Sequence, residues 1–201
     1  MLKLISVTGL IILNERSMAY NEIAEHKAQL ALIENDNETA VTVLMQTYGN
    51  DIYRFCRSML NNSADAQDVL QTVFIQAFNG FSKFRGNSNF RTWLYSIARN
   101  RCLDHIKKNR RLNQRVRFVD ELPEQVVQED AYDPFMSKII RQCLAKLSAK
   151  VRTAILLRFQ SGHSYEEAAI VVQEKAGTLQ ARVARALPTL RRCIEDNGIV
   201  L

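Results

Sequence analysis

Glycine and proline are scarce in this chain of 201 residues, which contains 7 glycines and 3 prolines. Runs of alternating valine, isoleucine and threonine between turn residues are missing as well. Strands and hairpins depend on both features, so the sequence argues against a β-sheet. It predicts an all-α protein with two small helical domains, each large enough to bury a core.

Paired metal ligands are missing too. The four cysteines, Cys56, Cys102, Cys143 and Cys193, form no CxxC motif, and the three histidines do not cluster with them. This spacing argues against a zinc site. Isolated cysteines are typical of small buried side chains in a reducing cytoplasm. We therefore expect no metal, no cofactor and a cytoplasmic protein.

No apolar run is long enough to cross a membrane. The amino-terminal stretch MLKLISVTGLIIL has 13 residues, whereas a bilayer-spanning helix needs roughly 20. The following NERSMAY is a poor cleavage site for a signal peptide. We expect residues 1–19 to be a disordered or weakly docked extension, with Met18 as an alternative start and no stable membrane insertion.

Catalytic motifs are also absent, since the sequence shows no paired carboxylates, nucleophile triad or Walker-type glycine loop. The formal net charge of +6 suits a polyanionic partner instead. A binding protein is therefore expected, not an enzyme.

Hydrophobic periodicity predicts helices over residues 20–34 and 38–60, separated by the polar break NDN. A third helix follows NNSAD, where Ser63 or Asp65 can act as the N-cap, and it ends at the NG pair 79–80. The buried stripe of the third helix is expected to contain Val69, Val73, Ile75, Ala77 and Phe78.

A fourth helix is expected from about Phe90 to Arg111, with Trp93 interpreted as a core side chain. Its exposed side is basic and holds one acid, Asp104. Residues 118–135 then contain six carboxylates, two of the three prolines and no lysine or arginine. Such a composition predicts a flexible acidic linker. The expected order is a first domain over 20–114, the linker over 115–135, and a second domain over 136–201.

The second domain contains a helix–turn–helix pattern, SYEEAAIVVQEKAGTLQARVARALPTLRR. Ser164 and Glu167 are spaced as a capping box for its first helix. Ala169 is expected where the two helices pass closely, and Leu179 is expected to anchor the second helix, with Thr178 as its N-cap.

Two residues depart from the usual pattern of such a motif. Gln173 stands where a glycine is common, but glutamine can adopt the left-handed turn at a cost of roughly 1 kcal/mol. Pro188 costs on the order of 3 kcal/mol inside a helix. We therefore expect the second helix to bend or end near Leu187, with Pro188 opening a final short helix.

The outward face of the second helix carries side chains that can read DNA. Gln180 can bind adenine, and Arg182 or Arg185 can bind guanine or phosphate. These residues alone leave two alternatives open, a DNA-reading element and a plain helical hairpin.

Two sets of motifs together resemble the extracytoplasmic-function (ECF) group of sigma-70 family RNA polymerase sigma factors, over roughly residues 28–195. The first set is YGNDIYRFCRSML, DAQDVLQTVF and FRGNSNFRTWLYSIARNRCLDHIKKNRR. The second is LSAKVRTAILLRFQSGHSYEEAA followed by GTLQARVARAL. The resemblance implies an alternative sigma factor that binds core RNA polymerase, recognises the −35 and −10 promoter elements and promotes melting. The implied partners are core RNA polymerase, promoter DNA and an anti-sigma factor or other regulator.

The resemblance also implies three sets of binding residues. The set implied for core polymerase is Asp65, Asp68, Gln71, Thr72 and Phe74. The set implied for the −10 element and the duplex beside it is Arg85, Gly86, Asn87, Ser88, Asn89, Phe90, Arg91, Arg99, Asn100, Lys107, Arg110 and Arg111. The set implied for the −35 element is Thr178, Gln180, Ala181, Arg182 and Arg185. The linker is either a nucleic-acid mimic or a solvated tether.

The polymerase-binding motif is less acidic than is usual in the family, which carries glutamates where this chain has Gln67 and Thr72. One hypothesis is that phosphorylation of Thr72 restores the negative charge. The departures at Gln67, Thr72 and Gln180 leave two rival interpretations, a sigma-like interaction module and a helix–turn–helix regulator without initiating activity.

Overall fold

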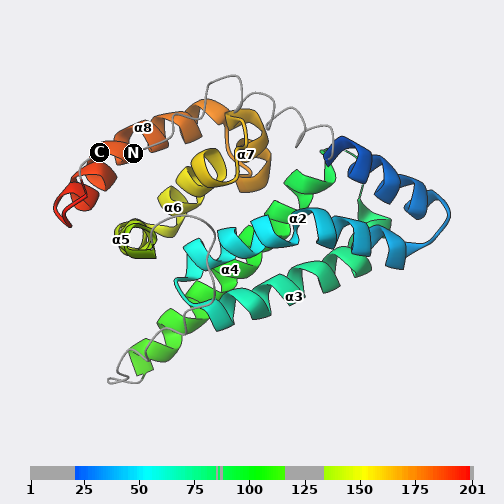
Figure 1. Ribbon diagram of the computed structural model, residues 1–201, viewed down its shortest axis with the longest axis horizontal. Helices are drawn as coiled ribbons and strands as arrows, with labels where there is room; N and C mark the ends of the chain where they lie inside the picture. The colour runs from blue at the N-terminus through cyan, green and yellow to red at the C-terminus, as the bar shows by residue number, and fades with distance from the viewer. Residues whose placement is uncertain (1–20, 85, 87, 116–133, 200–201) are drawn as a thin grey trace, which may run out of the picture.

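The computed structural model describes residues 21–84, 86, 88–115 and 134–199, without the side chains of 113–115 and 134. Helices are the only regular elements in these ranges (Figure 1). The all-α prediction is therefore confirmed. The expected N-terminal extension and most of the acidic linker lie outside the described residues.

The first domain begins with a helix over residues 21–33. It continues with α2 (Asn37–Leu60), α3 (Ser63–Gly80), a 3-10 turn η1 (Phe81–Lys83) and α4 (Phe90–Arg115). Helices α2, α3 and α4 lie side by side (Figure 1). Their shared core is filled by large buried side chains, among them Leu44, Ile52, Phe55, Met59, Val73, Leu94 and Tyr95.

The N-cap of α3 differs from the prediction. Asn62 has an extended backbone, and its side chain accepts a hydrogen bond from the Asp65 amide. Asn62 therefore ends the preceding turn, and Ser63 is already the first helical residue. The prediction that Ser63 or Asp65 is the N-cap was therefore wrong, because the cap is Asn62, which precedes both.

Two apolar side chains of α3 also lie on a different face from the one predicted. The Ile75 side chain is 61% exposed and that of Phe78 is 38% exposed. At about 100° per residue, Ile75 lies about 200° around the helix from the buried Val73. The stripe of Ala66, Val69, Val73 and Ala77 covers the core side, so Ile75 faces solvent.

The second domain contains α5 (Pro134–Ala145), α6 (Ala149–Ile155), a π-helical turn η2 (Leu156–Gln160), α7 (Tyr165–Val172) and α8 (Ala176–Glu195). Helices α7 and α8 form the helix–turn–helix. Both pack against other helices of the structure, α7 against α4 and α8 against α5 and α6.

The turn between α7 and α8 agrees with the sequence analysis. Ser164 and Glu167 form the predicted capping box. Gln173 has φ 56° and ψ 47°, which is the left-handed conformation expected there, and its amide donates to the carbonyls of Ala169 and Ile170. Leu179 is fully buried and anchors α8.

The start of α8 and its continuity differ from the prediction. Its N-cap is Lys175, so Thr178 lies exposed within the first turn. The helix runs through Pro188 without ending. Pro188 and Ala184 are both exposed, so water can bond the carbonyl that proline leaves unpaired. Buried side chains on both sides of Pro188, Val183 and Leu190, hold the helix together.

Pro188→Ala should stabilise the protein, because alanine restores the missing amide donor and removes the clash with the preceding turn. The expected gain in the free energy of unfolding is about 1–3 kcal/mol. Urea titration of the purified chain measures it. Thr189→Ala, at a neighbouring exposed position in α8, is the control and should change stability by less than about 0.5 kcal/mol. A Pro188→Ala protein no more stable than this control would contradict the account.

Candidate functional site

The outer face of α3 combines polar and apolar side chains. Asp68, Gln71 and Ile75 are exposed, and their spacing of three and four residues puts them on one face. The Thr72 side chain is half-buried beside them, and its hydroxyl donates to the Asp68 carbonyl at 2.9 Å. Together with Phe78, these side chains form what we call the α3 surface.

Two of the residues predicted for polymerase binding lie partly or wholly off this surface. Asp65 is half-buried, and its carboxylate is 2.9 Å from Nε2 of His105 on α4. Phe74 is only 6% exposed and packs in the core. Ile75, by contrast, was expected in the core. The helical periodicity of the sequence contained that signal, because Ile75 falls outside the 3.6-residue stripe.

The start of α4 is held by side-chain oxygens of Asn89 and Glu25. The Asn89 amide oxygen accepts from the Thr92 amide at 2.8 Å. The Glu25 carboxylate, in the first helix, accepts from the amides of Phe90 and Arg91 at 3.2 and 3.0 Å. Such bonds satisfy amides that the first helical turn leaves free. The side-chain oxygen of Asn89, a residue predicted to contact a base, therefore already accepts a hydrogen bond.

Aromatic rings pack beneath the loop before α4. The rings of Phe84 and Phe90 stack with centroids 4.4 Å apart, and the Trp93 ring lies 5.0 Å from Phe84. Phe90 is buried, and Trp93 is half-buried against Gly80. These contacts support the interpretation of Trp93 as a core side chain. In the loop, Gly86 and Asn89 are exposed and Ser88 is half-buried, while Arg85 and Asn87 lie outside the described residues.

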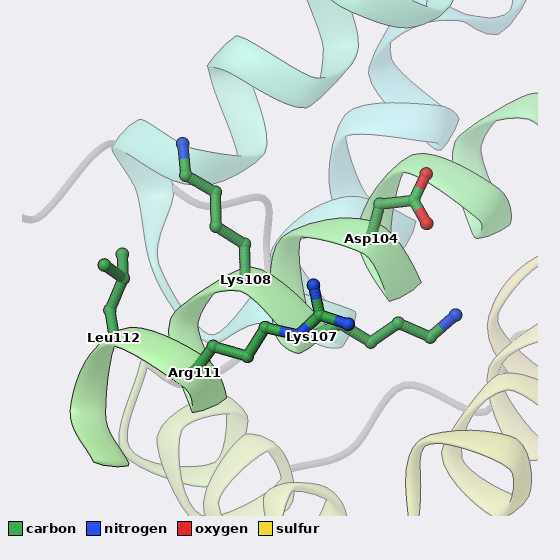
Figure 2. A pocket seen from close by; sticks show the side chains of 5 residues that line it. All are labelled: Asp104, Lys107, Lys108, Arg111 and Leu112. Carbon is green, nitrogen blue, oxygen red and sulfur yellow. The ribbon is translucent and has the colours of Figure 1, made fainter. Parts of the chain in front are cut away.

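The far end of α4 is a basic, concave surface. Figure 2 shows a hollow lined by the side chains of Asp104, Lys107, Lys108, Arg111 and Leu112, with a volume of about 520 Å³. The Asp104 carboxylate is 3.3 Å from the Arg101 guanidinium. The surface thus has an excess of positive charge, which suits a phosphate backbone. Arg110 and Asn100 are exposed on the same helix, and Arg99 is half-buried.

The first turns of α8 present the side chains predicted to read the −35 element. Thr178, Gln180, Ala181 and Arg185 are exposed. Arg182 is half-buried and forms an ion pair with Glu174, in the turn before the helix. This hydrogen bond is the main cause that lowers the pKa of Glu174. The pair fixes Arg182, so Gln180 and Arg185 are the long side chains of this face with the most freedom to reach a base.

The two domains pack against each other, which the sequence analysis did not anticipate. The Arg152 guanidinium donates to the carbonyl of Met59, at the end of α2. It also donates to three carbonyls around the end of α5: Leu144, Ala145 and Leu147. One cation thereby satisfies carbonyls that two helix ends leave free.

A second group of contacts joins the domains beside α7. The Gln160 side chain donates to the Ser58 hydroxyl at 2.9 Å and to the Arg54 carbonyl at 3.4 Å. The His163 ring is fully buried and packs edge-on against Tyr95 of α4, with centroids 4.6 Å apart. Among the described residues, neither nitrogen of this ring has a hydrogen-bond partner. Burial, followed by the positive charge of Arg91, lowers the pKa of His163 to about 3.

This packing brings the second domain next to residues predicted to bind the −10 element. Arg91 lies between the domains, with its guanidinium 5.8 Å from the Tyr95 ring and close to Gly162. Arg99 of the same helix contributes to the electrostatic environment of Glu174. The second domain therefore partly covers this section of α4.

Acid should weaken the packing between the domains. His163 has an ordinary pKa of 6.5 and a folded pKa of about 3, so the folded protein binds fewer protons than the unfolded one between these values. The stabilising contribution is complete above pH 6.5 and falls by roughly 1.4 kcal/mol per pH unit below it. Urea titrations at pH 7.5 and 5.0 measure this loss. His163→Phe, which cannot titrate, should show a smaller loss, and an equal loss in both proteins would contradict the assignment.

Two kinds of feature are absent from the part of the chain that the structure describes. No group of three histidine, cysteine or acidic side chains there could hold a metal ion. No helix over the same ranges is long and apolar enough to cross a membrane.

Comparisons with known proteins identify the family of this chain. The family model of Sigma-70 region 2 matches residues 44–112, and that of Sigma-70, region 4, matches residues 137–190. The ECF RNA polymerase sigma factor SigW of Bacillus subtilis (strain 168) is 30% identical over 181 residues, covering 85% of this chain and 97% of SigW.

Solved structures show the same fold. The sigma factor RpoE of Bartonella quintana, in complex with the anti-sigma factor NepR, is 27% identical with a TM-score of 0.65. That match covers 75% of this chain and 94% of RpoE. CnrH in complex with the cytosolic domain of CnrY is 22% identical, has a TM-score of 0.63 and covers 89% of this chain and 99% of CnrH. The chain therefore belongs to the sigma-70 family of RNA polymerase sigma factors, in the ECF group.

Proposed function

We propose that this sigma factor binds core RNA polymerase through the α3 surface, the −10 element through α4 and its preceding loop, and the −35 element through the start of α8. The observation that carries the proposal is the presence of all three surfaces on one chain, each with a distinct chemistry. The α3 surface has carboxylate and apolar groups, which suit a protein partner. The end of α4 is basic, and α8 presents glutamine and arginine, which suit DNA.

The packing of the two domains adds a step to this function. Arg91 is half-buried beside Gly162 of the second domain, so its side chain is only partly open to DNA in this arrangement. The hydrogen bonds of Arg152 and Gln160 between the domains can be exchanged for bonds with polymerase. We infer that the two domains are packed against each other in the free protein and that binding to core polymerase separates them.

The remaining aspects of the function follow from this role. Initiation takes place beside polymerase, so we place the protein in the cytoplasm. It binds and positions other molecules and catalyses no covalent change in them. An anti-sigma factor is a proposed partner, because RpoE is bound to one in its solved structure.

We also propose that Thr72 is a phosphorylation site that strengthens the α3 surface. Its half-buried hydroxyl lies one helical turn from Asp68, so a phosphate there would extend the negative charge of this face. Thr72→Glu should bind core polymerase about 3- to 10-fold more tightly than wild type, measured by fluorescence anisotropy. Thr72→Gln, of similar size but neutral, is the control. Binding of Thr72→Glu no tighter than wild type, together with no phosphate on Thr72 in cells, would refute the proposal.

Transcription in a purified system tests the function as a whole. The chain is added to core polymerase on a library of promoter fragments, and the transcripts are sequenced. Promoter-specific transcripts are the expected result. Sequence-specific binding of duplex without polymerase and without transcripts would favour a helix–turn–helix regulator. Binding of core polymerase without transcripts would favour a sigma-like interaction module.

A further inference from the structure

The four cysteines form two pairs with different environments. Cys56 on α2 and Cys102 on α4 are fully buried free thiols. A hydrogen bond to Cys56 and burial raise the pKa of the Cys102 thiol well above its usual value. A protonated thiol in an apolar core reacts slowly with oxidants. This pair is therefore expected to stay reduced, as the sequence analysis assumed for all four cysteines.

The second pair contradicts that assumption. Cys143 on α5 and Cys193 on α8 form a disulfide with Cα atoms 5.8 Å apart. Their spacing of 50 residues hid this pairing from the sequence, because only the fold brings the first and last helices of the domain together. A sigma factor works beside polymerase in a compartment where thiols are normally reduced, so a disulfide there is typically transient.

The surroundings of this pair suit reversible chemistry. Cys193 is half-buried, and the ammonium group of Lys146 lies 3.6 Å from its sulfur. A cation at that distance stabilises a thiolate, which is the form that attacks oxidants and disulfides. Cys143 is buried, and the side-chain amide of Asn197 lies 3.9 Å from its sulfur. Cys193 is thus the accessible thiol, and Cys143 is placed to resolve its oxidised form.

We propose that Cys143 and Cys193 are a reversible oxidation site, closed by a peroxide and opened by a cellular dithiol, that stabilises the second domain when closed. The Cys193 thiolate attacks one oxygen of hydrogen peroxide, forming a sulfenic acid and, after protonation, one water. The Cys143 thiol then attacks the Cys193 sulfur and displaces a second water. In sum, two thiols and one peroxide give one disulfide and two waters.

The position of the bond explains its expected effect. It joins α5 to α8 after Pro188 and encloses α6, η2, α7 and the DNA-reading turns of α8. Closing a loop of this length restricts the unfolded chain and so favours the folded domain. Both cysteines belong to the second domain, so the bond is compatible with separation of the two domains.

Two measurements on the full-length protein test this site. The fully reduced chain is treated with one equivalent of hydrogen peroxide, its free thiols are blocked, and its peptides are mapped by mass spectrometry. The expected product is a Cys143–Cys193 cross-link with Cys56 and Cys102 free. The oxidised protein should then melt roughly 5 °C or more above the reduced one, and a dithiol should reverse the shift.

Matched variants keep the result unambiguous. Cys193→Ala and Cys143→Ala should show no shift on oxidation, whereas Cys102→Ala should keep it. If a variant fails to fold, the peptide map and the melting temperatures of the oxidised and reduced wild-type protein still test the proposal. Formation of sulfinic acid without a cross-link, an unreacted pair, or equal melting temperatures would each overturn the proposal. None of these readouts involves transcription, so they succeed or fail independently of the proposed function.

Discussion

Reversing the charge of Asp68 should reduce the affinity for core polymerase by about 30-fold or more, equivalent to ~2 kcal/mol. Asp68 is exposed at the centre of the α3 surface, without an ion-pair partner among the described side chains. Lysine at this position would face the cationic groups that a carboxylate would attract.

Removing the exposed Ile75 side chain with Ile75→Ala should weaken the affinity for core polymerase by about 10-fold. An exposed apolar side chain surrounded by polar ones is typical of an interface anchor.

Anisotropy titration of labelled protein with core polymerase measures both effects. Glu34→Lys makes the same charge change on an exposed residue after the first helix, outside the α3 surface, and should leave the affinity within about twofold. Circular dichroism melts of all three variants show whether they fold. A folded Asp68→Lys protein that binds polymerase like Glu34→Lys would place the polymerase contact elsewhere.

Arg185→Ala should produce the second large effect, a loss of about 5- to 150-fold in binding to −35 duplex, as expected for one base-contacting arginine. Arg185 is exposed on the outward face of α8, and its Nε donates to the Ala181 carbonyl one turn earlier. That bond leaves its terminal nitrogens available to a guanine edge. Arg182 is less suitable for this role because Glu174 already holds it.

The matched control is Arg191→Ala, on the same helix, where the arginine is exposed and paired with Glu195. Binding is measured on the −35 sequence selected by the library experiment and on a scrambled duplex, over a range of salt concentrations. Loss of discrimination between the duplexes assigns a base contact to Arg185. Uniform weakening with a salt slope lower by about 1 assigns a phosphate contact. Equal affinities of Arg185→Ala and Arg191→Ala would remove Arg185 from the interface.

Local signals in the sequence predicted most of the helices and the DNA-reading turn. The capping box at Ser164 and Glu167, and the left-handed Gln173, are set by chemistry within a few residues. Leu179 follows from helical periodicity in the same way. Pro188 shows the limit of such reasoning, because buried contacts on both sides of it outweigh its low helical propensity.

Contacts between segments far apart in the chain could not be predicted from the sequence. Glu25 caps α4 from a helix more than sixty residues earlier, and Arg152 ties together the ends of α2 and α5. Glu25 lies outside the motifs recognised in the sequence, and Arg152 lies inside one that gives no sign of its partner in α2. The disulfide between Cys143 and Cys193 is of the same kind, since only tertiary packing brings its two sulfurs together.

Ile75 is a different case, because the helical periodicity of the sequence indicated its exposed position. The general tendency of isoleucine to be buried was given more weight. Isoleucine is commonly buried, and this general tendency suggested a core position. The periodicity of α3 places Ile75 on the opposite face from Val73, and the structure follows the periodicity. An apolar residue out of phase with its helix, such as Ile75, is therefore the kind of residue that we propose as a contact with polymerase.

The central claim is that the two domains must separate on core polymerase before they read a promoter together. A cross-link between them tests it most directly. Arg54 and Gln160 meet at the interface, so Arg54→Cys and Gln160→Cys can be joined by a short bis-maleimide, in a background with Cys143→Ala and Cys193→Ala. Transcription is then measured with core polymerase on a promoter from the library. We predict that the uncross-linked variant transcribes like its background and that the cross-linked one is inactive. Full activity of the cross-linked protein would contradict the claim.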